Sequence, residues 1–136
     1  MKSVREAKPE DKAEIIEIWR ACDLVKPQND PSHDFDLALQ TATSTIFVLN
    51  DSTKMIGAVM AGFDGHRGWF YYLGVLPEFQ RSGKGRLLVE TAEQWLASQG
   101  APKTMLMVRD TNTKVIAFYE KLGYNVEQTH VLGKRF

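Results

Sequence analysis

Two glycines and three basic residues between positions 80 and 86 form the segment of this chain best suited to hold an anion. Gly83 and Gly85 leave the backbone without Cβ atoms, so a ligand can approach the peptide N–H groups closely. Arg81, Lys84 and Arg86 add positive charge. A helix that begins here exposes N–H groups without internal acceptors and the positive end of its dipole. The segment therefore predicts a phosphate-binding loop, with an ordinary strand-to-helix connection as the alternative.

Two common phosphate-binding patterns do not fit this loop. A Walker loop needs serine or threonine after its Gly-Lys pair, whereas Gly85 follows Lys84 here. The dinucleotide-binding fingerprint needs a third glycine, and Leu88 stands in that place. What remains is the pattern Gln-x-x-Gly-x-Gly, formed by Gln80, Gly83 and Gly85 directly after a predicted strand.

The elements beside the loop are visible in the spacing of apolar residues. Residues 71–76 form an aromatic and aliphatic run, which is typical of a strand covered on both faces, and Pro77 ends it. From Arg86 to Gly100 the apolar residues recur with helical spacing. The loop is therefore expected to join a buried strand to the start of a helix.

The rest of the chain reads as alternating helices and strands around this unit. The expected strands are 3–7, 45–50, 55–63, 103–108, 124–126 and 129–132, and the expected further helices run from Pro9 to Cys22, from Ser32 or Asp34 through Leu39, and from about Asn112 to Leu122. Three strands in succession predict antiparallel pairing, and the strand–helix–strand unit predicts a right-handed crossover with parallel strands. The fold class is therefore α/β (α+β).

Composition limits what the chain can be. With 136 residues, 43% of them hydrophobic, residues 1–136 are expected to form a single domain with a real core. Seventeen basic and seventeen acidic residues cancel, which argues against nucleic-acid or membrane partners. Cys22 is the single cysteine, so no internal disulfide and no metal site are expected. No segment reaches the roughly 18 apolar residues of a membrane span and no secretory leader is visible, which predicts a cytoplasmic protein.

A second motif leads to a family. Residues 112–124 contain Asn112 and Val115 three residues apart, followed by Phe118 and the run Tyr-Glu-Lys-Leu-Gly-Tyr that starts at Tyr119. Together with the Gln-x-x-Gly-x-Gly loop, this resembles the GNAT N-acetyltransferase superfamily, whose fourth helix carries Asn-x-x-Ala before Tyr-Glu-Lys-Leu-Gly-Phe/Tyr. Val115 departs from the usual alanine. The resemblance covers nearly the whole chain and is strongest to a subgroup of small bacterial acetyltransferases.

This resemblance implies a GNAT fold. Its sheet would be mixed, mostly antiparallel and six- to seven-stranded, with about four helices, and its central parallel strand pair would splay at the acetyl-CoA site. The implied activity is transfer of an acetyl group from the co-substrate acetyl-CoA to an amine by direct attack, through a tetrahedral intermediate. A different class remains open: a non-catalytic CoA-binding regulatory module.

The resemblance also implies which residues bind the donor. Backbone N–H groups of the loop would hold the pyrophosphate, the strand before it would pair with the pantetheine arm, Val75 N–H would face the acetyl oxygen, and Asn112 would hold the arm from the other side. The implied cofactor-binding residues are Leu73, Gly74, Val75, Gln80, Arg81, Ser82, Gly83, Lys84, Gly85, Arg86 and Asn112.

Catalytic groups are less well defined. Tyr119 is the implied general acid for the departing thiolate, with a core tyrosine as the alternative reading. Positions 69–72 contain no carboxylate, whereas some relatives carry a glutamate there that serves as the general base. His66, Asp64 or bulk water could take the proton from the amine, and His66 is the candidate side chain because histidine titrates near neutral pH. The acceptor is expected to be a small-molecule or peptide amine, and a homodimer is a possible assembly.

Overall fold

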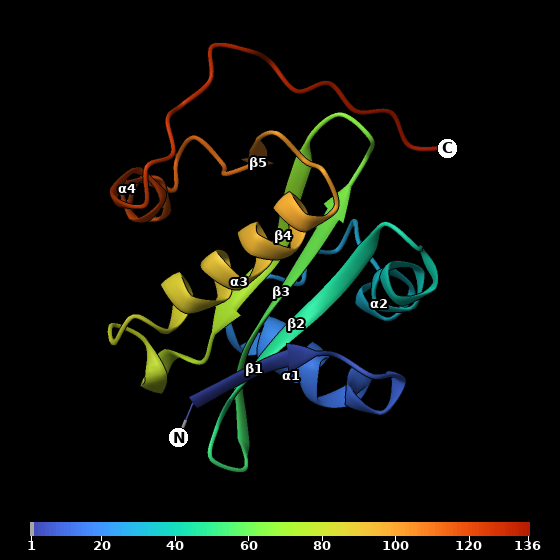
Figure 1. The fold of residues 1–136 in the computed structure, drawn as a ribbon, viewed down its shortest axis with the longest axis vertical. Helices are drawn as coiled ribbons and strands as arrows, with labels where there is room; N and C mark the ends of the chain where they lie inside the picture. Colours follow the sequence, from blue (N-terminus) through green and yellow to red (C-terminus); the bar gives the residue numbers. More distant parts are fainter. Residues whose placement is uncertain (1) are drawn as a thin grey trace.

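The computed structural model describes residues 2–136 and contains one five-stranded sheet in the order β1-β2-β3-β4-β5 (Figure 1). The strands are β1 (Lys2–Glu6), β2 (Ser44–Asp51), β3 (Lys54–Phe63), β4 (Gly68–Val75) and β5 (Thr104–Leu106). Neighbours from β1 to β4 are antiparallel, whereas β4 and β5 are parallel. The predicted mixed, mostly antiparallel sheet with one parallel pair is confirmed.

Helices cover both faces of this sheet. They are α1 (Lys12–Ala21), α2 (Pro31–Gln40), α3 (Lys84–Ser98) and α4 (Thr113–Lys121), with short 3₁₀ turns at Pro9–Asp11 (η1) and Pro77–Phe79 (η2). Helices α1 and α2 pack on one face, here called the α1/α2 face, and α3 packs on the other, the α3 face. Within residues 2–136, no helix is long and apolar enough to cross a membrane.

Strand β2 shows why both faces need a cover. Ile46 and Val48 point into the core under α1 and α2, while Phe47 and Leu49 point into the core under α3. Successive side chains of a strand face opposite sides, so an uninterrupted apolar run is buried only if both sides are covered. All four side chains are in fact buried.

Strand β4, which neighbours β5, contains a β-bulge in its pairing with β3. Ala58 of β3 pairs with Gly74, but Met60 pairs with Tyr71, so β4 has one residue more than β3 over this stretch. Tyr72 within it has a φ of 55°, which is uncommon for a bulky residue. A bulge bends its strand. Strand β5 pairs with β4 only from Gly68 to Phe70, so the two parallel strands separate beyond Phe70, as the expected splay requires.

The C-terminal segment differs from the prediction. Six to seven strands were expected, but the sheet has five, and the predicted strands at 124–126 and 129–132 are absent from the described chain. Val126, Val131 and Leu132 are 70%, 69% and 93% exposed. Strand propensity depends on packing against neighbours. Because β5 is only three residues long, it offers these valines a short edge, and residues 125–136 remain irregular and exposed.

Candidate donor and acetyl-transfer site

The loop between β4 and α3 presents free backbone N–H groups. Gly83 is the N-cap residue of α3, with a φ of 77°, and the first helical hydrogen bond runs from Leu87 N–H to Gly83 O over 3.0 Å. Arg81 also has a φ of 77°. No backbone N–H group between Arg81 and Arg86 donates to another described residue. The loop and the first turn of α3 therefore offer a row of donors at the positive end of a helix dipole.

Side chains fix this loop and set its charge. Gln80 Nε2 donates to the carbonyl oxygen of Val75 over 2.9 Å and so ties the loop to the end of β4. Lys84 is buried, and its ammonium group donates to the hydroxyl of Ser82. Arg86 Nε lies 2.6 Å from Glu90 Oε1, one helical turn further along. Lys84 keeps positive charge beside the free N–H groups, whereas Glu90 offsets the charge of Arg86.

The end of β4 leaves one edge of its backbone open. Leu76 N–H donates to Ile56 O of β3 over 2.8 Å, and the Gly74 carbonyl also faces β3, 3.0 Å from where a side chain on Gly57 would begin. In a trans peptide the C=O and N–H groups point in opposite directions. The Val75 N–H therefore points away from β3, toward the gap left by β5. Alternation along the strand places the Leu73 carbonyl on the same side.

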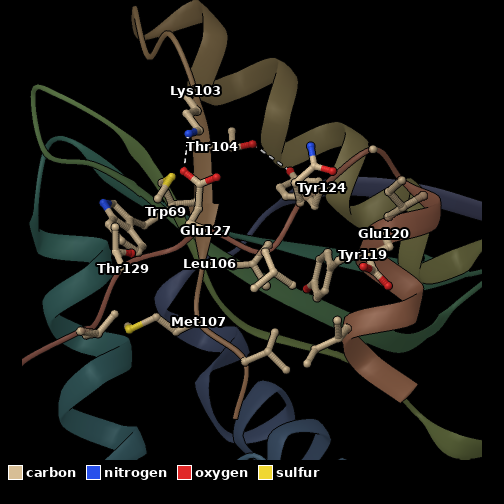
Figure 2. A pocket seen from close by; sticks show the side chains of 18 of the residues that line it. Trp69, Lys103, Thr104, Leu106, Met107, Tyr119, Glu120, Tyr124, Glu127 and Thr129 are labelled. Carbon is tan, nitrogen blue, oxygen red and sulfur yellow. Dashed lines mark hydrogen bonds and ion pairs between the residues drawn. The ribbon is translucent and has the colours of Figure 1, made fainter. Parts of the chain in front are cut away.

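Helix α4 brings Tyr119 from the C-terminal part of the chain into the core cluster that contains Val75. Tyr119 is 7% exposed, with edge-to-face ring contacts to Phe118 at 5.0 Å and to Tyr124 at 5.5 Å. Burial raises the pKa of its phenol. No side-chain hydrogen bond of its hydroxyl occurs among residues 2–136, where the neighbouring Tyr124 hydroxyl does bond to Glu93 and Thr104, and Figure 2 shows the Tyr119 ring facing Leu106 of β5. Tyr119 is thus a protonated phenol that is free to donate.

Contact between α4 and α3 places Tyr119 near the loop. The ring of Phe118 lies 3.3 Å from the position where a Cβ on Gly85 would stand. A larger residue at position 85 would therefore push α4 away. Asn112 precedes α4 as its N-cap residue, is exposed, and makes no side-chain hydrogen bond within the described chain.

The sequence model of the acetyltransferase (GNAT) family matches residues 12–124. The chain belongs to this family. It is 42% identical to an acetyltransferase of Yersinia enterocolitica and 40% identical to one of Pectobacterium atrosepticum, each over 97% of this chain and 94% of the relative. The predicted family and the predicted enzyme class, an acetyltransferase, are confirmed.

Solved structures described as acetyltransferases have the same fold. An aminoglycoside N-acetyltransferase in complex with CoA matches with a TM-score of 0.85 at 15% identity, covering 99% of this chain and 95% of that one. A protein from Clostridium acetobutylicum, described as a predicted acetyltransferase with acetyl-CoA, matches with a TM-score of 0.80 at 13% identity, covering 98% and 96%. At these identities the likeness concerns the fold.

A cysteine that the sequence alone did not single out for the site lies against the open edge of this GNAT strand. Cys22, directly after α1, donates its thiol to the Val75 carbonyl at 3.3 Å, beside the bond from Gln80. A side chain on Gly74 would begin 2.9 Å from Cys22 Sγ and 3.0 Å from Leu24 Cδ1, so only glycine fits there. Burial raises the pKa of the thiol, which stays protonated and can donate.

His66 is not brought to the site. It lies in the turn between β3 and β4, where Asp64 Oδ1 accepts from the backbone N–H of His66 at 2.8 Å and of Arg67 at 2.7 Å. These bonds lower the pKa of the Asp64 carboxyl. The turn precedes Gly68 at the start of β4, seven residues before Val75, which corresponds to about 23 Å of extended strand. His66 and Asp64 therefore stand at the end of β4 opposite to the gap.

A cavity of about 830 Å³ lies outside β5, between β5, α4 and the C-terminal segment (Figure 2). Tyr119 lines it, but no residue of the loop from 80 to 86 does. Tyr124 closes one side, because its hydroxyl donates to Glu93 Oε2 at 2.6 Å and lies 2.8 Å from Thr104 Oγ1. This cavity meets the GNAT site only at Tyr119.

Proposed function

We propose that this GNAT protein is an acetyl-CoA-dependent N-acetyltransferase that acetylates a primary amine of a small molecule by direct attack. The observation that carries the proposal is the row of unpaired N–H groups from Arg81 to Arg86, next to the open backbone edge of Val75. A diphosphate and an extended arm with amide groups match these two features. Acetyl-CoA contains both.

The donor would be held in three places. Backbone N–H groups from Arg81 to Arg86 bind the pyrophosphate, supported by the α3 dipole and by Lys84. The pantetheine arm lies along the open edge of β4, where the Leu73 carbonyl accepts from one of its amides. Asn112, whose side chain has no partner within the described residues, holds the arm from the α4 side. Relatives in fold that were solved with CoA and acetyl-CoA support this choice of donor.

The transfer itself needs no metal and no covalent enzyme intermediate. The lone pair of the neutral amine attacks the thioester carbonyl carbon, a C–N bond forms, and the C–S bond then breaks. Val75 N–H donates to the carbonyl oxygen as negative charge develops on it. The nitrogen loses one proton to solvent and the departing thiolate gains one, so the products are the acetamide and CoA.

Tyr119 would supply the proton for the thiolate. Its hydroxyl makes no hydrogen bond to another side chain or backbone group of residues 2–136, and Tyr119 packs in the same core cluster as Val75. Burial raises its pKa, so the group remains protonated at neutral pH, as a general acid must. We assign no side chain as the base, because His66 lies at the far end of β4; solvent takes the proton from the amine.

Two glycines at opposite ends of α3 provide the test. Gly83 and Gly100 have φ values of 77° and 100°, and a side chain on either would meet nothing within 4 Å. Alanine at each therefore imposes a similar backbone strain, on the order of 1 kcal/mol, but only Gly83 lies in the loop. Calorimetric titration with CoA should show affinity weakened at least tenfold in Gly83→Ala and kept in Gly100→Ala.

Turnover is measured separately as CoA release with a panel of small amines. Release with at least one amine supports the transferase. Equal CoA affinity in Gly83→Ala and the wild type would contradict the assigned donor site. Tight CoA binding with no release on any amine would instead indicate the CoA-binding regulatory module.

A further inference from the structure

A carboxylate on α2 is held in one position beside the bulge of β4. The hydroxyl of Tyr72 donates to Asp34 Oδ2 over 2.7 Å, across 38 residues of sequence. The Tyr72 ring stacks on Trp19 of α1, with centroids 4.1 Å apart and planes 17° apart. Tyr72 itself has a φ of 55°. A strained backbone is retained when its surroundings fix it, and here α1 and α2 both do so.

Asp34 lacks the ion pair that Asp36 and Asp23 make, as does Asp30, whose carboxylate instead caps α2. Asp36, also on α2, lies 2.9 Å from Lys12 Nζ, and Asp23 lies 3.2 Å from Lys26 Nζ. Among residues 2–136, Asp34 makes no ion pair, and its Oδ1 accepts no hydrogen bond. The side chain is half-buried. A partly desolvated carboxylate attracts a cation more strongly than an exposed one.

Which ligand the Asp34 carboxylate can bind depends on where it lies relative to the gap beside Val75. Val75 and Leu73 pack toward the α3 face, where the donor loop lies. Tyr72 packs toward the α1/α2 face, and a side chain on Gly74 would contact Cys22 on that same face. A donor bound from the α3 face leaves the acceptor to approach the open edge of β4 past Cys22, on the α1/α2 side. Tyr72 is two residues from Gly74, about 7 Å along the strand.

We infer that Asp34, oriented by Tyr72, binds a second positive charge of the acceptor while the attacked amine stands at the Gly74–Val75 peptide. A second anionic contact selects dications, such as α,ω-diamines, over monoamines with the same carbon chain. This inference rests on the proposed acetyltransferase function and names its substrate class.

A purely structural role for the pair makes a different prediction. If Tyr72 and Asp34 only tie β4 to α2, asparagine at position 34 preserves the tie, since its amide oxygen also accepts from the Tyr72 hydroxyl. Stability could then change, but the preference between a diamine and a monoamine would not. The charge matters only if a cation binds there.

The experiment compares initial rates with 1,6-diaminohexane and hexylamine, in the wild type, Asp34→Asn and Asp36→Asn. Both substitutions remove one negative charge from α2, and Asp36 serves as the matched control. We expect the wild type to favour the diamine in kcat/KM by about twentyfold, of which a factor of two is statistical, because a charge-assisted contact changes binding by roughly tenfold. Asp34→Asn should reduce the ratio to about two, mainly through KM, and Asp36→Asn should keep it.

Two further variants and one binding measurement complete the test. Asp34→Glu should restore part of the preference, and Tyr72→Phe, which keeps the stacked ring, should reduce it by less than Asp34→Asn does. The same ratio in Asp34→Asn and the wild type would overturn the inference, as would a wild-type ratio near two. Absence of CoA binding in calorimetry would overturn the proposed function itself, whereas binding and amine acetylation without diamine preference overturn only the role of Asp34.

Discussion

The two edges of β4 are built differently, and the difference separates stability from function. Toward β3, pairing continues from Gly68 to Val75 and ends with the hydrogen bond from Leu76 to Ile56. Toward β5, pairing stops at Phe70. On the edge toward β3, the backbone N–H and C=O groups are already used in hydrogen bonds within the sheet. The open edge keeps the Val75 N–H available for a ligand.

The bulge at Tyr72 is what makes one strand serve both purposes. It adds a residue to β4 opposite β3, so the pairing resumes after it at Ala58 and Gly74, and such a bulge bends its strand. Trp19 and Asp34 hold Tyr72 from the α1/α2 face. Residues far from the donor loop therefore fix the position of the bulge.

The largest effect is expected on the paired edge. Ile56 of β3 is fully buried in the core under α3, so Ile56→Ala should lower the free energy of unfolding by about 3 kcal/mol, from lost transfer energy and a cavity. Urea denaturation measures the loss. The folded variant should bind CoA within about twofold of the wild type, and a loss of affinity in the folded protein would show that the two edges are not separable.

Loss of the Tyr119 hydroxyl at the open edge should affect turnover rather than folding. Tyr119→Phe is expected to lower kcat by about a hundredfold, the usual contribution of a general acid, with CoA affinity nearly unchanged. Tyr124→Phe is the control, because that hydroxyl is already bonded to Glu93 and Thr104. Since burial raises the pKa of Tyr119 above its ordinary value of 10, wild-type kcat should not fall through ionisation of this group below about pH 10. Unchanged turnover would remove the assignment.

Gly74 joins the two faces, and its substitution should couple to Cys22. Gly74→Ala places a methyl group 2.9 Å from Cys22 Sγ, which forces α1 or β4 to move and should cost about 1–3 kcal/mol of stability. We also expect kcat/KM to fall by about tenfold, because the Val75 N–H shifts with the strand. Adding Cys22→Ala should recover part of both losses. Strict additivity in this double-mutant cycle would contradict the contact.

The smallest effects concern the two donors on the Val75 carbonyl. Gln80 Nε2 donates at 2.9 Å and Cys22 Sγ at 3.3 Å. A single hydrogen bond contributes on the order of 1 kcal/mol. Gln80→Ala should therefore weaken CoA binding several-fold, and Cys22→Ala should lower kcat less than twofold while leaving CoA affinity unaltered. A larger effect from the thiol than from the amide would reverse the assigned order.

Sequence patterns predicted the elements on the N-terminal side well, because their apolar residues recur with a regular period. The hairpin from 45 to 63, the strand ending at Val75 and the helix ending near Gly100 all appear close to their predicted bounds. The last strands failed. Their short apolar runs fit a strand only if a neighbouring strand offers a long edge, and the three residues of β5 do not.

The candidate site divides in the same way. The spacing of Gln80, Gly83 and Gly85, together with the motif beginning at Asn112, was sufficient to indicate the family and a donor loop, because a helix start binds anions through local backbone geometry. His66 was plausible from its chemistry alone. Only the distance along β4 removed it from consideration.

The sequence by itself determined the loop, the order of the elements down to α4 and the family, all of which depend on residues close together in the chain. Only the tertiary structure decided that Cys22 contacts Gly74 and Val75 and that Asp34 contacts Tyr72. Cys22 and Val75 are 53 positions apart in the sequence, and Asp34 and Tyr72 are 38 positions apart. Packing of helices on a sheet creates such contacts, and no local pattern encodes them. The open edge of β4 arises in the same way, because β5 pairs with β4 only as far as Phe70.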